Sequence, residues 1–363
     1  MPVPHVAIAV LCGTTGGPAT YGLRLVAALR ELGEVRLSVL TDRPAPFDLP
    51  GVDAIDLPMK GGLDRLRWQH LAVPRALRKL APDVYHDTKN ALPRRLPCPA
   101  VVTVHDLAYH TVPESFGFAS RWFLKAATRD AVRRARVVVV PSRATAADLQ
   151  RIHPDRGDRV HVVPHGIDPA LAVAPEQLAD ARRRLSLPDP YVLHVGTIQA
   201  RKNVDLVVRG VRELRRRGLP HRALVVGRRG WLAERAFAEI ERDDAARWIE
   251  HVSQQDLHAC YAGAAAFASP SAYEGFGFAV ADALAHGVPT CIADISSLPE
   301  LCGDAAVRLP ELSGVAIADA LEPVLRSHER GQQLAMAGRR RAAEFSWQAA
   351  AEGHLRAYRA ALA

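Results

Sequence analysis

The chain has 363 residues, of which 48% are hydrophobic and 24% charged, and its formal net charge is +8. This length predicts two domains, and the composition is typical of a soluble globular protein. No apolar run approaches the roughly eighteen residues that a membrane-spanning helix requires. The five cysteines show neither a metal-ligand spacing nor a disulfide framework, and the first residues lack the features of a secretory signal. We therefore expect a cytoplasmic protein in a reducing compartment.

Positive charge is concentrated in the first half of the chain. Residues 1–170 carry a net charge of +7 and the remainder carries +1, with basic runs in Lys60–Leu80 and Arg121–Arg136. Two interpretations of these runs stay open. They are solvated helix faces, or they form a surface that attracts anionic lipid or a phosphate-bearing acceptor. Nucleic acid is not an expected partner, because no recognised binding module or aromatic stacking platform accompanies the charge.

Short valine-rich runs alternate with helical patterns along the chain. Such continuous apolar strands predict parallel sheets with helices on both faces, and two series of them predict an α/β protein of two doubly wound domains. The first series of expected strands is Val6–Val10, Val35–Leu40, Asp83–His86, Ala100–His105, Val137–Val140 and Val160–Val163. The second series is Tyr191–Gly196, Ala223–Gly227, Trp248–Glu250, Ala266–Pro270 and Pro289–Ala293.

The domain boundaries follow from these two series. We expect an N-terminal domain over residues 1–170 and a C-terminal domain over residues 191–345. Residues 171–190 are rich in proline and contain no strand pattern, so they are expected to connect the two domains. A serine at an N-cap position and an amphipathic repeat predict a final helix over residues 346–363.

Ligands of doubly wound sheets bind beyond the carboxyl ends of the strands, so the residues that follow the strands are the candidates for function. The loop after the first strand, CGTTGGPATYG, contains Gly16 and Gly17 and can bring backbone close to a phosphate or a sugar. It does not fit GxGxxG, and a tight turn without a ligand explains it equally well. His105 and Asp106 follow a later strand, where a histidine either binds a ligand hydroxyl or has a structural role.

Two adjacent cations follow the first strand of the second series. In the stretch GTIQARKN, Arg201, Lys202 and Asn203 are expected to open a helix. The N-terminus of a helix attracts anions, so two cations there are electrostatically unusual. A bound diphosphate resolves this, because the helix dipole, the guanidinium and the ammonium all match its charge.

The stretch SPSAYEGFGFAVADALAHGVP is also expected to lead from the end of a strand into a helix. Glu274 precedes the glycine-rich turn of Gly275, Phe276 and Gly277, and this turn leads into a helix that carries Asp282. Glu274 can accept hydrogen bonds from sugar hydroxyls, and Asp282 is placed to reach a second part of the same ligand. An elongated ligand with hydroxyl-rich ends and a central diphosphate fits this pattern. A nucleotide-diphosphate sugar is such a ligand.

Several motifs together resemble those of the family-4 retaining glycosyltransferases. VHDL, PSRATAADL, VVPHGID, HVGTIQARKN, SAYEGFGFAVADALAHGVPT and SSLPELCGDAA occur in the order of that family over nearly the whole chain. The resemblance implies a GT-B fold, in which two Rossmann-like domains face each other across a cleft. It also implies that the final helix packs back on the N-terminal domain.

The resemblance assigns roles to individual residues. Arg201 and Lys202 would hold the donor diphosphate and stabilise the leaving group, and Glu274 would bind the transferred sugar. Asp282 departs from the family pattern, which usually has a glutamate there to contact the ribose, and its carboxylate is one methylene shorter. His105 would lie beside the sugar. The remaining donor-binding residues would be Gly16, Gly17, Gly196, Thr197, Gly275, Phe276 and Gly277.

The expected activity is therefore retaining, metal-independent transfer of a hexosyl residue, of mannosyl or glucosyl type, without a cofactor. No DxD motif follows a strand, which is the reason for expecting no metal. GDP-mannose and UDP-hexoses are the expected donors. The expected acceptor is a glycan, a lipid-linked sugar or a small molecule, and a lipid-linked acceptor would be reached at the inner face of the plasma membrane. A nucleotide-sugar 2-epimerase of the same fold and a non-catalytic nucleotide-sugar-binding protein stay as alternatives. A nicotinamide dehydrogenase is disfavoured, because no GxGxxG follows the first strand.

Overall fold

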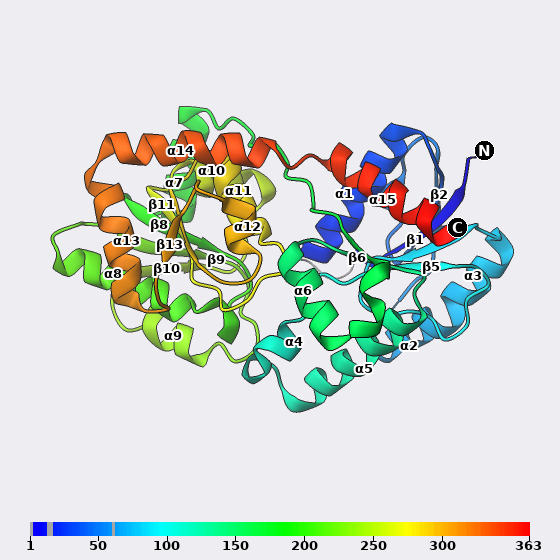
Figure 1. The fold of residues 1–363 in the computed structure, drawn as a ribbon. Helices are drawn as coiled ribbons and strands as arrows, with labels where there is room; N and C mark the ends of the chain where they lie inside the picture. Colours follow the sequence, from blue (N-terminus) through cyan, green and yellow to red (C-terminus); the bar gives the residue numbers. More distant parts are fainter. Residues whose placement is uncertain (1–2, 13–16, 60–61) are drawn as a thin grey trace. The chain divides into compact units, whose positions relative to one another are not determined.

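The computed structural model describes residues 3–12, 17–59 and 62–363. The chain divides into two compact units, and each is described by itself (Figure 1). Unit 1 comprises Met1–Leu107, Phe118–Gly166 and Phe345–Ala363, and unit 2 comprises Ala108–Gly117 and Ile167–Glu344.

Unit 1 is built on a parallel sheet in which seven strands are described, in the order β3-β2-β1-β4-β5-β6-β7. The central strands β1, β4, β5 and β6 are buried along their whole length, as expected when helices cover both faces of a parallel sheet. The strands are β1 (His5–Val10), β2 (Arg36–Thr41), β3 (Val52–Asp56), β4 (Val84–Asp87), β5 (Ala100–Thr103), β6 (Val137–Val140) and β7 (Val160–Val162).

Helices cover both faces of this sheet. Within unit 1, Figure 1 shows α1 and α15, drawn in blue and red, side by side on one face, with α3 and α5 on the other. The first and last helices of the chain are therefore neighbours on the same sheet. The helices of unit 1 are α1 (Gly17–Leu32), α2 (Gly62–Arg67), α3 (Val73–Leu80), α5 (Phe118–Arg134), α6 (Arg143–Ile152) and α15 (Trp347–Leu362).

A buried chain of hydrogen bonds ties α15 to the sheet. The Nδ1–H of His354 donates to the backbone carbonyl four residues earlier, so its Nε2 accepts from the hydroxyl of Tyr21 at 2.7 Å. Thr103 then donates to Tyr21, His86 Nε2–H donates to Thr103, and the hydroxyl of Tyr358 donates to His86 Nδ1 at 2.9 Å. Burial lowers the pKa of both histidines, that of His354 to about 4, so each is neutral and every member has a partner.

Unit 2 is built on a second parallel sheet, in which six strands are described in the order β10-β9-β8-β11-β12-β13. Its central strands β8 and β11 lie side by side but are separated in sequence by β9 and β10, so the strand order reverses between them. The strands are β8 (Tyr191–Val195), β9 (Arg222–Val226), β10 (Ala246–Ile249), β11 (Ala266–Ser269), β12 (Thr290–Ala293) and β13 (Val307–Leu309).

The core of unit 2 lies between its sheet and the helices α8, α9 and α13. Val207, Phe237 and Ile317 from these helices pack with Val192 and Val225 of the strands. Figure 1 shows α10, α11 and α14 on the other face. The helices are α4 (Ala108–Thr111), α7 (Pro175–Leu185), α8 (Val204–Arg216), α9 (Glu234–Ile240), α10 (Gln254–Ala262), α11 (Phe278–His286), α12 (Leu298–Cys302), α13 (Gly314–Arg326) and α14 (His328–Ala343).

The predicted fold class, with two doubly wound parallel sheets, is confirmed. The eleven expected strands are present, but β3 and β13 were not predicted. Both lie at an edge of their sheet, where one side of a strand has no neighbour. In β3, VDAID, acidic residues alternate with apolar ones, and most positions are half-buried. Strand β13 has only three residues. Neither strand therefore shows the continuous apolar run of a central strand.

The stretch 171–190, expected to connect the domains, contains an ordered helix of unit 2. Helix α7 packs against α10, and Arg184 on α7 donates two hydrogen bonds to the carboxylate of Asp256 on α10, at 2.6 and 3.1 Å. Among the prolines that suggested a connector, Pro175 occupies the first turn of this helix, and Pro188 and Pro190 lie between its end and β8.

Candidate active site

The candidate donor residues come from two neighbouring loops of unit 2. Arg201 and Lys202 follow β8, and Glu274 follows β11. These two strands are the pair between which the strand order reverses, and their loops extend from the carboxyl edge of the sheet. A crevice at such a point is where open α/β sheets bind ligands. The topology therefore brings residues more than seventy positions apart to one place.

The RKN stretch is attached to the β11 loop by its backbone and its side chains. Arg201 donates from its side chain to the carbonyl of Tyr273, and its own carbonyl accepts from the N–H of Ala272 at 2.8 Å. Asn203 donates from its side-chain amide to the carbonyl of Pro270 at 2.8 Å. The sequence predicted that these residues open a helix directly. Instead Arg201 and Lys202 form a short 3₁₀ turn, and α8 begins after Asn203.

Arg201, Lys202 and Glu274 form a buried ionic triad. The guanidinium of Arg201 lies 3.2 Å from one carboxylate oxygen of Glu274, and the ammonium of Lys202 bonds the other. All three side chains are between 10% and 14% exposed. Burial by itself would raise the pKa of Glu274, but the charges of Lys202 and Arg201 outweigh it and hold that pKa at about 2. Glu274 is therefore ionised at neutral pH and accepts hydrogen bonds without donating any.

Two serines that the sequence analysis did not single out hold the backbone around Glu274. The hydroxyl oxygen of Ser296 accepts from the N–H of Glu274 at 2.9 Å. The hydroxyl of Ser297 donates to the carbonyls of Glu274 and Phe276, at 2.9 and 3.1 Å. Both serines follow β12, the next strand of the sheet, so their place after a strand was the signal that could have identified them.

The glycine-rich turn leads into the N-terminus of α11. Gly277 is the N-cap residue with a φ of +101°, and a Cβ atom there would lie 2.8 Å from the side chain of Leu298, so glycine is required. Gly275 and Phe276 are buried, and the ring of Phe276 packs against that of Phe278. The first turn of α11 contains no acidic residue and no capping side chain. Its N–H groups are therefore suited to an anionic ligand.

Gly196 and Thr197 lie at the end of β8, beside the triad. Gly196 has a φ of +145°, which favours glycine, and its Cα faces the Lys202 side chain, since a Cβ there would come within 4.0 Å of it. Thr197 is half-buried and packs against Gly230. These two residues connect β8 to the turn that carries Arg201 and Lys202.

His194 is a further buried polar group at this edge. It lies on β8, and its Nδ1 donates to the carbonyl of Ala268 on β11 at 2.9 Å, while its Nε2 has no hydrogen-bond partner among the described residues. Burial lowers the pKa of His194 to about 4, so the ring is neutral. A polar strand residue in an otherwise apolar run, YVLHV, was the sequence signal for it.

Asp282 lies in a different environment from Glu274. It is the fifth residue of α11 and is partly buried. Burial raises its pKa, and the charge of Asp168 raises it further, to about 7. The pKa of Glu274 is thus lowered and that of Asp282 is raised. Perturbed pKa values of this kind are common at functional sites.

The other predicted residues belong to unit 1. His105 follows β5, and its Nε2–H donates to the carbonyl of Thr88 at 2.7 Å, which leaves Nδ1 as an acceptor. Burial lowers the pKa of His105, and its ring packs edge-on against Tyr21. Gly17 is the first residue of α1. Gly16 lies outside the described residues.

Among the residues that the structure describes, no group of three His, Cys, Asp or Glu side chains could hold a metal ion. In the same ranges, no helix combines the length and the apolar character needed to cross a membrane.

The sequence is similar to known glycosyltransferases. Residues 15–171 match Glycosyltransferase Family 4, and residues 189–327 match Glycosyl transferases group 1. The chain is 26% identical to the O-antigen chain mannosyltransferase B of Escherichia coli, over 78% of this chain and 76% of that protein. It is 34% identical to the D-inositol 3-phosphate glycosyltransferase of Nocardia farcinica over 60% of this chain, and it spans about half of that relative, 51%.

A solved structure shares the fold. The Anabaena protein HepE in complex with UDP and glucose superposes with a TM-score of 0.77 and 15% identity, over 97% of this chain and 98% of that one. The fold and the motif order define a glycosyltransferase of the GT-B class. The chain belongs to glycosyltransferase family 4, which transfers sugars from nucleotide sugars.

The pKa of Asp282 leads to a test by mutation. Its value in the folded chain is about 7, above the ordinary 3.8, so the stability that the protonated form provides is complete below pH 3.8 and is lost as the pH rises through 7. We predict that Asp282→Asn raises the free energy of unfolding more at pH 8 than at pH 5, by on the order of 1–3 kcal/mol.

Urea unfolding of both proteins at the two pH values measures this difference. Glu311→Gln is the matched control, because Glu311 is an exposed acid of the same unit and its replacement should leave the pH dependence unchanged. An identical pH dependence of the wild type and Asp282→Asn would contradict the assignment.

Proposed function

We propose that the protein is a retaining, metal-independent hexosyltransferase that takes a mannosyl or glucosyl residue from a GDP- or UDP-sugar. The observation that carries this proposal is the buried triad of Arg201, Lys202 and Glu274 at the reversal of strand order. It combines two cations suited to a diphosphate with a permanently ionised acceptor suited to sugar hydroxyls. The HepE structure, solved in complex with UDP and glucose, supports a sugar-nucleotide donor.

In the proposed reaction, the bond between the anomeric carbon of the sugar and the diphosphate oxygen breaks. A bond from the acceptor oxygen to the same carbon forms on the same face, and the acceptor proton passes to the departing phosphate. Arg201 and Lys202 stabilise the charge that develops on the diphosphate, together with the N–H groups at the start of α11. Their low exposure increases the strength of these interactions, because little water screens them.

Glu274 positions the sugar in this proposal. Because its pKa is about 2, it does not serve as a general acid at neutral pH. It accepts hydrogen bonds from the sugar, and its negative charge stabilises positive charge that builds up on the ring. Asp282, with a pKa of about 7, would contact the ribose directly or through a bridging water. His105 would present the acceptor atom Nδ1 to the ligand.

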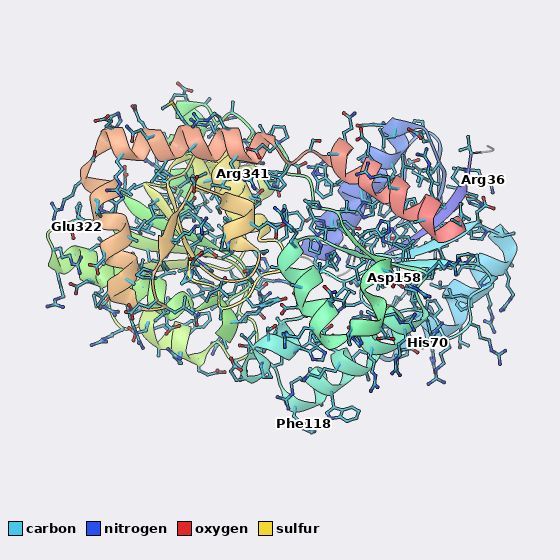
Figure 2. The ribbon with its side chains drawn as sticks, viewed as in Figure 1. Arg36, His70, Phe118, Asp158, Glu322 and Arg341 are labelled. Carbon is cyan, nitrogen blue, oxygen red and sulfur yellow. The ribbon has the colours of Figure 1, made fainter. Side chains whose placement is uncertain are left out.

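We also propose that the protein works in the cytoplasm and binds the anionic inner face of the membrane through unit 1. Arg75, Arg78 and Lys79 of α3 are exposed. Phe118 and Trp122 at the start of α5 are 72% and 65% exposed, and Figure 2 shows Phe118 projecting from that helix. The guanidinium of Arg121 lies 5.8 Å from the centroid of the Phe118 ring. Exposed aromatic rings beside basic residues are suited to the interface of an anionic membrane. A lipid-linked acceptor fits this location.

The donor site is tested by removing both cations. We predict that Arg201→Ala with Lys202→Ala lowers kcat/KM for turnover of the sugar nucleotide by on the order of a hundredfold to ten-thousandfold, because each charge-assisted hydrogen bond contributes about 1.5–3 kcal/mol. Arg209→Ala is the matched control, since Arg209 lies on the following helix and pairs with Glu239.

The double replacement leaves the Glu274 carboxylate buried without its partners, so thermal unfolding is measured alongside. Adding Glu274→Gln removes the stranded charge and restores stability if the loss comes from that charge. Wild-type turnover by the double variant would refute the donor site, and formation of a new UDP-hexosamine without any acceptor would favour the epimerase.

Membrane binding is tested by sedimentation with anionic vesicles. Replacing Arg75, Arg78 and Lys79 by alanine should reduce the pelleted fraction, because each basic residue near an anionic surface contributes about 1 kcal/mol. Replacing three cations of α8 that lie in unit 2, Arg209, Arg212 and Arg215, gives the same change of charge elsewhere. An unchanged pellet for the α3 variant would refute this surface.

A further inference from the structure

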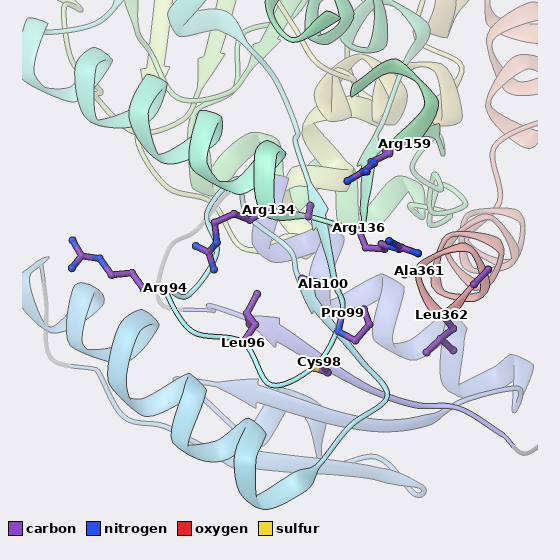
Figure 3. Close-up of a pocket in the computed structure, with 12 residues that line it drawn as sticks. Arg94, Leu96, Cys98, Pro99, Ala100, Arg134, Arg136, Arg159, Ala361 and Leu362 are labelled. Atoms are coloured by element: carbon purple, nitrogen blue, oxygen red, sulfur yellow. The ribbon is translucent and has the colours of Figure 1, made fainter. Parts of the chain in front are cut away.

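Four arginines surround a hollow in unit 1 that the proposed reaction does not use. Its volume is about 610 Å³, which lies within the range of small-molecule sites. Figure 3 shows Arg94, Arg134, Arg136 and Arg159 around it. The four side chains come from three separate parts of the sequence, so the fold assembles the cluster.

The hollow lies at the amino ends of the strands. Arg136 directly precedes β6, Arg159 directly precedes β7, and Ala100, which also lines the hollow, is the first residue of β5. His105 follows the carboxyl end of β5. The hollow and the candidate residue of unit 1 are therefore at opposite ends of the same strand.

The positions of two arginines are fixed by the surrounding structure. Arg134 donates to the carboxylate of Asp130 at 2.8 Å and to the carbonyl of Pro93. The backbone N–H of Arg136 donates to the carbonyl of Ala100 at 2.8 Å, which places its Cα at the edge of the sheet. The cluster is thus attached to ordered strands and a helix end.

The positive charge of the cluster is largely uncompensated. Among the described residues, no acidic side chain bonds or pairs with Arg94, Arg136 or Arg159, and only Arg134 has such a partner. Like charges held close together repel, so an anion that binds among them is favoured.

The hollow also has an apolar side. Leu96, Pro99, Ala361 and Leu362 line it together with the arginines (Figure 3). A ligand with a compact anionic head and a less polar remainder fits this division. Guanidinium groups bind phosphate through paired hydrogen bonds, which makes phosphate the best match for a cluster of arginines.

We propose that this hollow binds a phosphate-bearing anion at the sheet edge opposite His105. A phosphate monoester carries a charge of about −1.5 to −2 at neutral pH, which offsets much of the excess positive charge of the cluster. A soluble phosphorylated molecule and a phospholipid head group offer the same chemistry. The site does not depend on the proposed sugar transfer.

Calorimetric titration with inorganic pyrophosphate tests this site. The titration uses the chain with Arg201→Ala and Lys202→Ala, so that the proposed donor site does not contribute. Adding Arg136→Gln and Arg159→Gln should weaken binding about tenfold or more, since each lost charge-assisted hydrogen bond is a substantial part of the affinity. Arg129→Gln with Arg133→Gln is the matched control, because both are exposed arginines of α5 outside the hollow.

A second measurement uses the wild-type chain and needs no variant. Phenylglyoxal modifies accessible arginines, and mass spectrometry locates the modified positions. Pyrophosphate should protect Arg136 and Arg159 but leave Arg129 and Arg133 reactive. Equal protection of all four, equal weakening by the control variant, or no binding of pyrophosphate would each overturn the proposal.

A third experiment distinguishes a phospholipid head group from a soluble phosphorylated ligand. Vesicles containing phosphatidic acid are pelleted with the wild type and with the Arg136→Gln, Arg159→Gln variant. A lipid head group is identified if the variant pellets less than the wild type and if pyrophosphate reduces the pelleting of the wild type. Unchanged pelleting with intact pyrophosphate binding identifies a soluble ligand.

Discussion

The attachment of Glu274 to Arg201 and Lys202 is the interaction on which the candidate donor site depends. It joins the loops of β8 and β11, which no nearby sequence connects. A buried charge that loses its partner is energetically costly, so each member of the triad holds the other two in place. The serines after β12 fix the same loop from the other side. The site is thereby organised before any ligand arrives.

The triad also affects how a donor would bind. Its two cations and one carboxylate leave one positive charge, so the carboxylate offsets the repulsion between the two cations. An entering diphosphate adds negative charge next to Glu274, and the N-terminus of α11 offsets part of it. At the proposed donor site, nucleotide binding would therefore redistribute existing hydrogen bonds around Glu274. Asp282 separately contributes a carboxyl group whose charge changes near neutral pH.

The sequence predicted the strands, the order of the motifs and the loops that meet at the reversal of strand order, because apolar runs and turn residues are local signals. It did not predict that Glu274 pairs with Arg201 and Lys202, since this pairing depends on strand order in three dimensions. The edge strands β3 and β13 and the helix α7 were missed because partial exposure and prolines obscure their patterns. The raised pKa of Asp282 reflects burial and Asp168, which lies more than one hundred residues away.

The most direct test of the donor site is the thermal stabilisation of the purified protein by GDP, UDP, ADP and NAD, each with and without EDTA. A ligand at about one hundred times its Kd stabilises the folded state by about 2.7 kcal/mol, which shifts the unfolding temperature measurably. The account predicts a shift with GDP or UDP that EDTA does not change. A shift with NAD alone, or with none of the four, would contradict it.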